Sequence, residues 1–117
     1  MEPGAGMGPG GEVGEKLVRD RIPELIRAAG GAPETRVAAP VEARRLLQAK
    51  LQEEVGELLA SDDAEELADV LEVVLALARE SGLAPDALEA LRARKAAERG
   101  GFDRRLVLRF TPEDPAR

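Results

Sequence analysis

Four acidic residues are spaced so that they form two pairs on helical faces. Glu54 and Glu57 make one pair and Glu66 and Asp69 the other, because residues three apart are neighbours on one side of a helix. Glu54 and Glu66 fall among apolar residues at helical spacing, so both are expected to be partly buried. Buried carboxylates are costly unless a partner compensates them, and Lys50 is the basic residue nearest in sequence. A hard divalent cation held by oxygen ligands, most simply Mg²⁺ with Mn²⁺ able to substitute, would compensate them.

Acidic residues on helices are also often no more than a solvated surface. That interpretation is favoured for Glu65 and Glu72, which fall on outward faces of the predicted helices. For Glu54 and Glu66 the apolar neighbours on both sides favour a site instead. Glu53 stays open between two roles, a base close to the metal and a surface residue.

Two long helices are needed to bring these carboxylates together. The sequence predicts helices over residues 41–60 and 63–81, joined by a short turn and running antiparallel as a hairpin. In such a hairpin, residues equidistant from the turn lie side by side, so all four carboxylates are expected at one level. The expected N-cap and capping-box residues of the second helix are Asp62 or Asp63 and Glu65 or Glu66.

Shorter elements flank the hairpin. Proline in the first turn and glycine after the last predict helices over residues 22–29 and 85–99, and residues 106–110 alternate like a short strand. The sequence therefore predicts an all-α fold with a short C-terminal strand. The Gly/Pro-rich start, residues 1–14, is expected to be a flexible tail, followed by one domain over residues 15–110 and a C-terminal tail over residues 111–117.

The helix expected over residues 63–81 is apolar on most of its surface. One stripe consists of Val70, Val73 and Leu77, and the side away from it is formed by Leu67, Leu71, Val74, Leu75 and Ala78. A helix that is apolar on most sides is buried from most sides, and three helices of one small chain can hardly cover it. We therefore expect a homo-oligomer, a dimer or a tetramer, in which hairpins of two copies pack as a four-helix bundle.

Composition excludes several function classes. The 117 residues include no Cys and no His, which excludes thiolate metal sites, the usual catalytic zinc sites and Ser–His triads. A net charge of −6 argues against binding to a nucleic-acid polymer, which requires a basic face. No apolar run is long enough for a membrane span, and the first residues lack the basic start and apolar stretch of a signal peptide. The expected location is the cytoplasm.

Two basic groups suggest a phosphate ligand. Lys95 and Arg99 lie four apart and would repel each other, a cost that an anion between them removes; the two glycines that follow allow a close approach of the backbone. Lys16 and Arg19 form a second group. Cations beside a carboxylate-bound Mg²⁺ are typical of sites for phosphate chains. The alternative for both groups is solvated charge, which the helix dipole favours at residues 95–99.

These residues together resemble a known family. The order of Glu53, Glu54 and Glu57 as E-E-x-x-E, followed by E-x-x-D, resembles the all-α nucleoside triphosphate pyrophosphohydrolases, which include the MazG proteins, the dimeric dUTPases and phosphoribosyl-ATP pyrophosphohydrolase. Three flanking segments are similar to a MazG-like subgroup often named phosphoribosyl-ATP pyrophosphohydrolase-like: KLVRDRIPELI, ELADVLEVVLAL and RKAAERGGFDRRLVL. The resemblance covers nearly all of residues 16–108.

The resemblance implies Mg²⁺-dependent cleavage between the α- and β-phosphates of a nucleotide, which releases a monophosphate and pyrophosphate. Carried over by position, the metal ligands would be Glu54, Glu57, Glu66 and Asp69. The carboxylates near the attacking water would be Glu53 and Glu54. The phosphate-binding residues would be Lys16, Arg19, Lys95 and Arg99. Two features depart from the family: Gly56 replaces a residue that is often charged or polar, and the turn between the acidic motifs is shorter than in many MazG proteins.

Three functions are compatible with this pattern. The leading hypothesis is a pyrophosphohydrolase that clears non-canonical or excess nucleotides. The second is the histidine-pathway reaction on phosphoribosyl-ATP; the KLVRD start favours the first, because the pathway enzyme resembles this chain mainly in the acidic helices. The third is not an enzyme but an acidic helical oligomer that binds Mg²⁺ or nucleotide and regulates a partner.

Overall fold

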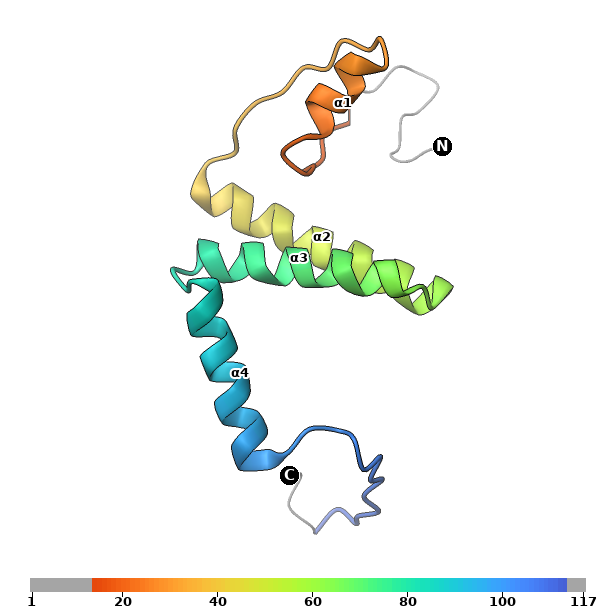
Figure 1. The fold of residues 1–117 in the computed structure, drawn as a ribbon, viewed down its shortest axis with the longest axis vertical. Coiled ribbons are helices and arrows are strands. Elements are labelled where there is room, and N and C mark those ends of the chain that lie inside the picture. Colours follow the sequence, from red (N-terminus) through yellow and green to blue (C-terminus); the bar gives the residue numbers. More distant parts are fainter. Residues whose placement is uncertain (1–13, 114–117) are drawn as a thin grey trace. The chain divides into compact units, whose positions relative to one another are not determined.

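The computed structural model describes residues 14–113, and within them the chain is all-α, as predicted. Its four helices are α1 (Ile22–Ala28), α2 (Pro40–Ser61), α3 (Ala64–Glu80) and α4 (Pro85–Arg99) (Figure 1). The described residues divide after Leu83 into two compact units, of which the first carries α1 to α3 and the second α4. Nearly all of the predicted tail over residues 1–14, and the end of the C-terminal tail, lie outside the described residues.

Proline and glycine set the helix ends close to where the sequence predicts them. Each helix except α3 has a proline in its first two positions, where a missing N–H costs nothing. At the end of α3, Gly82 has φ +80° and the N–H of Leu83 donates to the carbonyl of Ala78 at 2.8 Å. This is the 6→1 hydrogen bond of a Schellman motif, which requires the left-handed conformation that glycine adopts without strain.

The turn between α2 and α3 consists of two residues, Asp62 and Asp63. Asp62 ends α2 in the left-handed region, with φ 59°, and Asp63 caps α3 by accepting from the N–H of Glu65 at 3.1 Å. The N–H of Asp63 donates to the hydroxyl of Ser61 at 3.3 Å. The predicted N-cap is confirmed at Asp63. The predicted capping box differs, because the Ser61 hydroxyl accepts the hydrogen bond from the Asp63 N–H that a glutamate would accept in a capping box.

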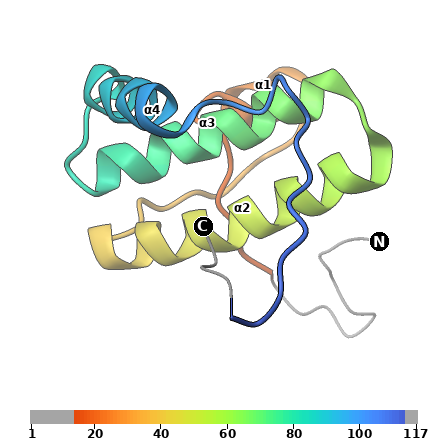
Figure 2. The ribbon, with the colours of Figure 1, turned by 90° about the horizontal axis from the view of Figure 1, so that it is seen from below.

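Helices α2 and α3 pack side by side as an antiparallel hairpin (Figure 2). Among the described residues, Leu47, Val73 and Ala78 are the buried apolar side chains. The other apolar residues at helical spacing on α2, Leu51, Val55 and Leu58, are half-buried. By contrast, Leu67 and Leu71 on α3 are 58% and 56% exposed, so the described residues leave these two apolar side chains largely uncovered.

Arg36 ties the loop before α2 to the segment before α1. Its guanidinium donates to both carboxylate oxygens of Glu42, at 2.9 and 2.6 Å, and to both of Glu15, at 3.2 and 3.0 Å. These hydrogen bonds hold the pKa of the Glu15 and Glu42 carboxyls below its usual value. Residue 15 is thereby fastened to the first turn of α2.

In the unit that begins at Ala84, the predicted short strand does not form. Residues 106–110 keep their alternating pattern, but the part of the chain that the structure describes contains no strand. A strand needs a second segment to take its backbone hydrogen bonds, and none pairs with this one. Its large apolar side chains are exposed.

Among the described residues, no helix has both the length and the apolar character that crossing a bilayer requires.

Gly56→Ala is expected to raise the free energy of unfolding by about 1 kcal/mol, since a glycine inside a helix costs that much relative to alanine. A Cβ atom added at Gly56 would meet nothing within 4 Å. Gly82→Ala is the opposing control, because its φ of +80° strains any residue with a side chain. Urea unfolding measures both variants. A loss of stability in Gly56→Ala would mean that a helix of another copy packs against this glycine.

Candidate functional site

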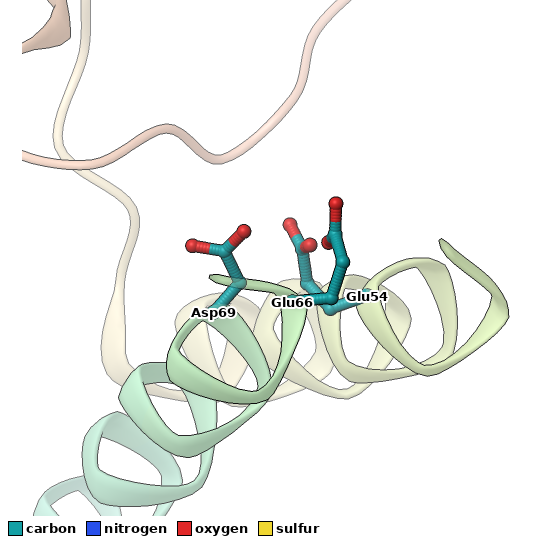
Figure 3. A group of neighbouring side chains, drawn as sticks. All are labelled: Glu54, Glu66 and Asp69. Carbon is teal, nitrogen blue, oxygen red and sulfur yellow. The ribbon is translucent and has the colours of Figure 1, made fainter. Parts of the chain in front are cut away.

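Three carboxylates converge on one side of the hairpin. Glu54 comes from α2, and Glu66 and Asp69 come from neighbouring turns of α3; one oxygen from each lies within 4.8 Å of the others. Figure 3 shows the three carboxyl groups projecting to the same side of the two helices. All three side chains are half-buried. The antiparallel register therefore does what the sequence predicts for these residues, which we call the acidic trio.

Glu66 is the electrostatically strained member of the trio. Its Oε1 atom is buried and has no hydrogen-bond partner among the described residues, a costly state for a carboxylate oxygen. Desolvation is the largest cause of a raised pKa for the Glu66 carboxyl, and the negative charges that raise it further belong to Glu57, Asp69, Glu54 and Asp63. An all-carboxylate donor set with an unsatisfied oxygen fits a hard divalent cation such as Mg²⁺ or Mn²⁺.

Two basic side chains already neutralise parts of the trio. Lys50 lies one turn before Glu54 on α2, with Nζ at 3.6 Å from a Glu54 oxygen and 3.1 Å from a Glu53 oxygen. From the segment before α1, Arg19 donates through Nη2 to Oδ1 of Asp69 at 2.7 Å. Glu54 and Asp69 thus each have a cationic partner, in contrast to Oε1 of Glu66.

A cavity of about 420 Å³ adjoins the trio. It lies between residues 17–21 and the facing sides of α2 and α3, and Glu54 and Asp69 form part of its wall. The basic side chains that line it are Arg19, Arg21, Lys50 and Arg79. Its volume is in the range of small-molecule sites. Negative charge at one edge and several cations elsewhere suit a ligand that carries both a metal ion and an extended anion.

The other predicted site residues are not members of the trio. Glu57 and Glu53 are both exposed; Glu57 is outside the converging group, although its charge acts on Glu66. Lys16 is exposed at the start of the described segment. Lys95 and Arg99 are exposed on α4 in the other unit, where Arg99, the two glycines after it and Phe102 line a hollow.

Arg79 and Arg21 are cavity residues that the sequence analysis did not single out. For Arg79 a pattern was present, because residues 69, 72, 76 and 79 are spaced three or four apart and continue the face of α3 that carries Asp69. Glu72, predicted to face outward, lines the cavity on this face and lies 3.8 Å from Arg79. Arg21 offers no comparable pattern, since it precedes a short helix and pairs locally with Glu24.

Comparison with known proteins adds one relative and no family. An uncharacterized protein of Mycolicibacterium smegmatis is 57% identical over 47 residues, which are 40% of this chain and 48% of that protein. The chain thus matches about half the length of this relative, whose name states no activity. No family model matches the chain, and no solved structure matches it.

Proposed function

We propose that this chain is a Mg²⁺-dependent nucleotide pyrophosphohydrolase, which cleaves a nucleoside triphosphate or a related nucleotide to a monophosphate and pyrophosphate. The observation that supports it most is the acidic trio, with its buried and unpartnered Glu66 oxygen, at the edge of a cavity lined by basic side chains. The family resemblance of the acidic motifs points the same way. A cytoplasmic site of action on non-canonical or excess nucleotides is part of the proposal.

Each side chain has a role in this proposal. Glu54, Glu66 and Asp69 would hold the cation, with Glu57 one turn away as a fourth candidate. A bound Mg²⁺ would supply charge neutralisation on the phosphates and a lower pKa for a nearby water. Glu53 or Glu54 would position that water and take its proton. Glu53 is the more exposed of the two, with 45% of its side chain accessible against 12% for Glu54.

The cavity side chains would bind the phosphate chain. Arg19 stands closest to the trio, at Asp69, and Lys50 bridges the two candidate bases on α2. Guanidinium groups suit phosphate oxygens because they donate two parallel hydrogen bonds. Lys95 and Arg99 on α4 remain proposed phosphate ligands. Lys16, three residues before Arg19 in sequence, is proposed for the same role.

A nucleotide panel tests the proposal. The protein is incubated with millimolar Mg²⁺ and canonical, deoxy and modified triphosphates, together with phosphoribosyl-ATP, and pyrophosphate is measured. We expect pyrophosphate release from at least one nucleotide and none in EDTA. Turnover of phosphoribosyl-ATP alone would assign the histidine-pathway reaction. No turnover, with Mn²⁺ or nucleotide still bound, would favour a non-catalytic regulator.

Assembly into a homo-oligomer is the second part of the proposal. Leu67 and Leu71 project from a helix on which Val73 is buried, and covering them with a second hairpin would complete a four-helix bundle. We expect at least a dimer at micromolar concentration by light scattering after size exclusion. Leu71→Lys is expected to weaken it, whereas the control Val37→Lys, at a loop residue that is 96% exposed, is not. A stable wild-type monomer would contradict this part.

A further inference from the structure

Arg19 donates a hydrogen bond to a carboxylate oxygen of Asp69, a residue that is a candidate ligand of the metal ion. Its Nη2 lies 2.7 Å from Oδ1 of Asp69, the length of a charge-assisted hydrogen bond. The two residues are fifty positions apart in sequence. This is therefore a tertiary contact and not a local pairing of the kind that solvated helices make between neighbouring turns.

The backbone that carries Arg19 is anchored at the site. Leu17 and Val18 are half-buried and line the same cavity as Leu47 and Val73. Glu15, two residues before Leu17, forms an ion pair with Arg36, which also pairs with Glu42 in the first turn of α2. Arg19 is thus presented to the trio by a segment with its own apolar and ionic attachments, which do not depend on the pair with Asp69.

Resting on the proposed function, we infer that Arg19 is the internal counter-ion of the metal site. In the metal-free protein it neutralises Asp69. When a divalent cation is bound by the trio, the like charges repel, and Arg19 gives up Asp69 and turns to the polyphosphate anion in the adjoining cavity. One side chain then couples the two ligands: it opposes the cation when the anion is absent and binds the anion once the cation is present.

This coupling predicts opposite effects on the two ligands when Arg19 is replaced. Arg19→Met keeps most of the aliphatic stem and removes the charge. It is expected to bind Mn²⁺ at least about threefold more tightly than the wild type, because a competing ion pair and a nearby positive charge are both lost. With Mn²⁺ saturating, the same variant is expected to bind inorganic pyrophosphate about tenfold more weakly, since a charge-assisted hydrogen bond is lost.

Binding measurements on the full chain test the inference without any reading of turnover. Free Mn²⁺ is followed by electron paramagnetic resonance, and pyrophosphate binding to the Mn²⁺-loaded protein by calorimetry. Arg21→Met is the matched control for Mn²⁺, because it removes the same charge from the same cavity wall at a residue that pairs with Glu24 and not with the trio. Circular dichroism checks the fold, and Arg19→Lys, expected to lie between wild type and Arg19→Met, serves if the latter does not fold.

Each outcome decides a different statement. Tighter Mn²⁺ binding in Arg19→Met than in Arg21→Met, together with weaker pyrophosphate binding, supports the inference. Equal or weaker Mn²⁺ binding in Arg19→Met overturns it and leaves the proposed function in place. Failure of the wild type to bind Mn²⁺ overturns the proposed function, and the inference with it.

Discussion

Glu66→Gln is expected to abolish the rise in melting temperature that millimolar Mg²⁺ or Mn²⁺ gives to the wild-type protein. A ligand that binds only the native state stabilises it by about 1.4 kcal/mol at ten times its dissociation constant, or roughly 5–10 °C in a domain this small. Glu66 carries the buried oxygen without a partner, so it gains most from a cation. Glutamine has the same shape but no charge to offer. Differential scanning fluorimetry with and without metal measures the effect.

The matched control is the adjacent residue. Glu65→Gln makes the same chemical change at an exposed position outside the trio, so this variant is expected to keep the full metal-dependent rise. The backbone N–H of residue 65 still donates to the side chain of Asp63, so the start of α3 is expected to be unchanged. Equal stabilisation of wild type and Glu66→Gln by metal would show that the trio is not the metal site.

The same variant has a second, pH-dependent consequence in EDTA. Glu66 titrates near 4.5 in the unfolded chain, and its pKa is raised in the folded one. As the pH rises past 4.5, the unfolded chain releases this proton first, so the free energy of unfolding falls until the pH exceeds the folded-state pKa. Glu66→Gln has no such group. It is expected to be more stable than metal-free wild type at neutral pH, with the difference vanishing below 4.5; a difference independent of pH would contradict this explanation.

The sequence predicts the helices well because their bounds depend on local rules, and three of the four carboxylates expected together do converge. Proline begins α1, α2 and α4, and Asp62 and Asp63 end α2 and cap α3. A tight turn forces residues equidistant from it to face each other, which places Glu54 opposite the first turns of α3. For Glu57 such rules do not suffice, because it was expected with the other three carboxylates and is outside their group. It lies at the border of the apolar stripe that Leu47, Leu51, Val55 and Leu58 form on α2. Whether a border residue faces the partner helix depends on how far the helix is rotated in the packed hairpin. In the structure it faces solvent.

Contacts between distant segments lie beyond what periodicity can predict. Nothing in the spacing of KLVRD places Arg19 on Asp69, because the contact depends on how residues 14–20 cross the hairpin. The strand predicted over residues 106–110 was wrong for a related reason: alternation states which side chains share a face, but not whether a second segment is present to pair with it. Lys95 and Arg99 lie in a separate unit, so their predicted role at the phosphates stays a prediction.

Hydrolysis in ¹⁸O-labelled water is expected to place the label in the nucleoside monophosphate and none in the pyrophosphate. The chain contains neither Cys nor His, two side chains that commonly form covalent intermediates, so direct attack by water is the simpler route. Two carboxylates on α2 are proposed to take the proton from that water: Glu54, which lines the cavity, and Glu53, which lies 3.1 Å from Lys50. Mass spectrometry of both products measures the label.

Which product carries the label depends on which phosphorus the water attacks and which phosphates leave together. Arg19, Lys50 and Arg79 offer cationic partners along the cavity wall, and such partners favour a leaving group that carries two phosphates away together. Attack at the α-phosphorus then puts solvent oxygen on the monophosphate. Label in the pyrophosphate would place the attack on the β-phosphorus instead. Release of single phosphate would contradict the pyrophosphohydrolase proposal, because the bond between the terminal phosphates would then be the one that breaks.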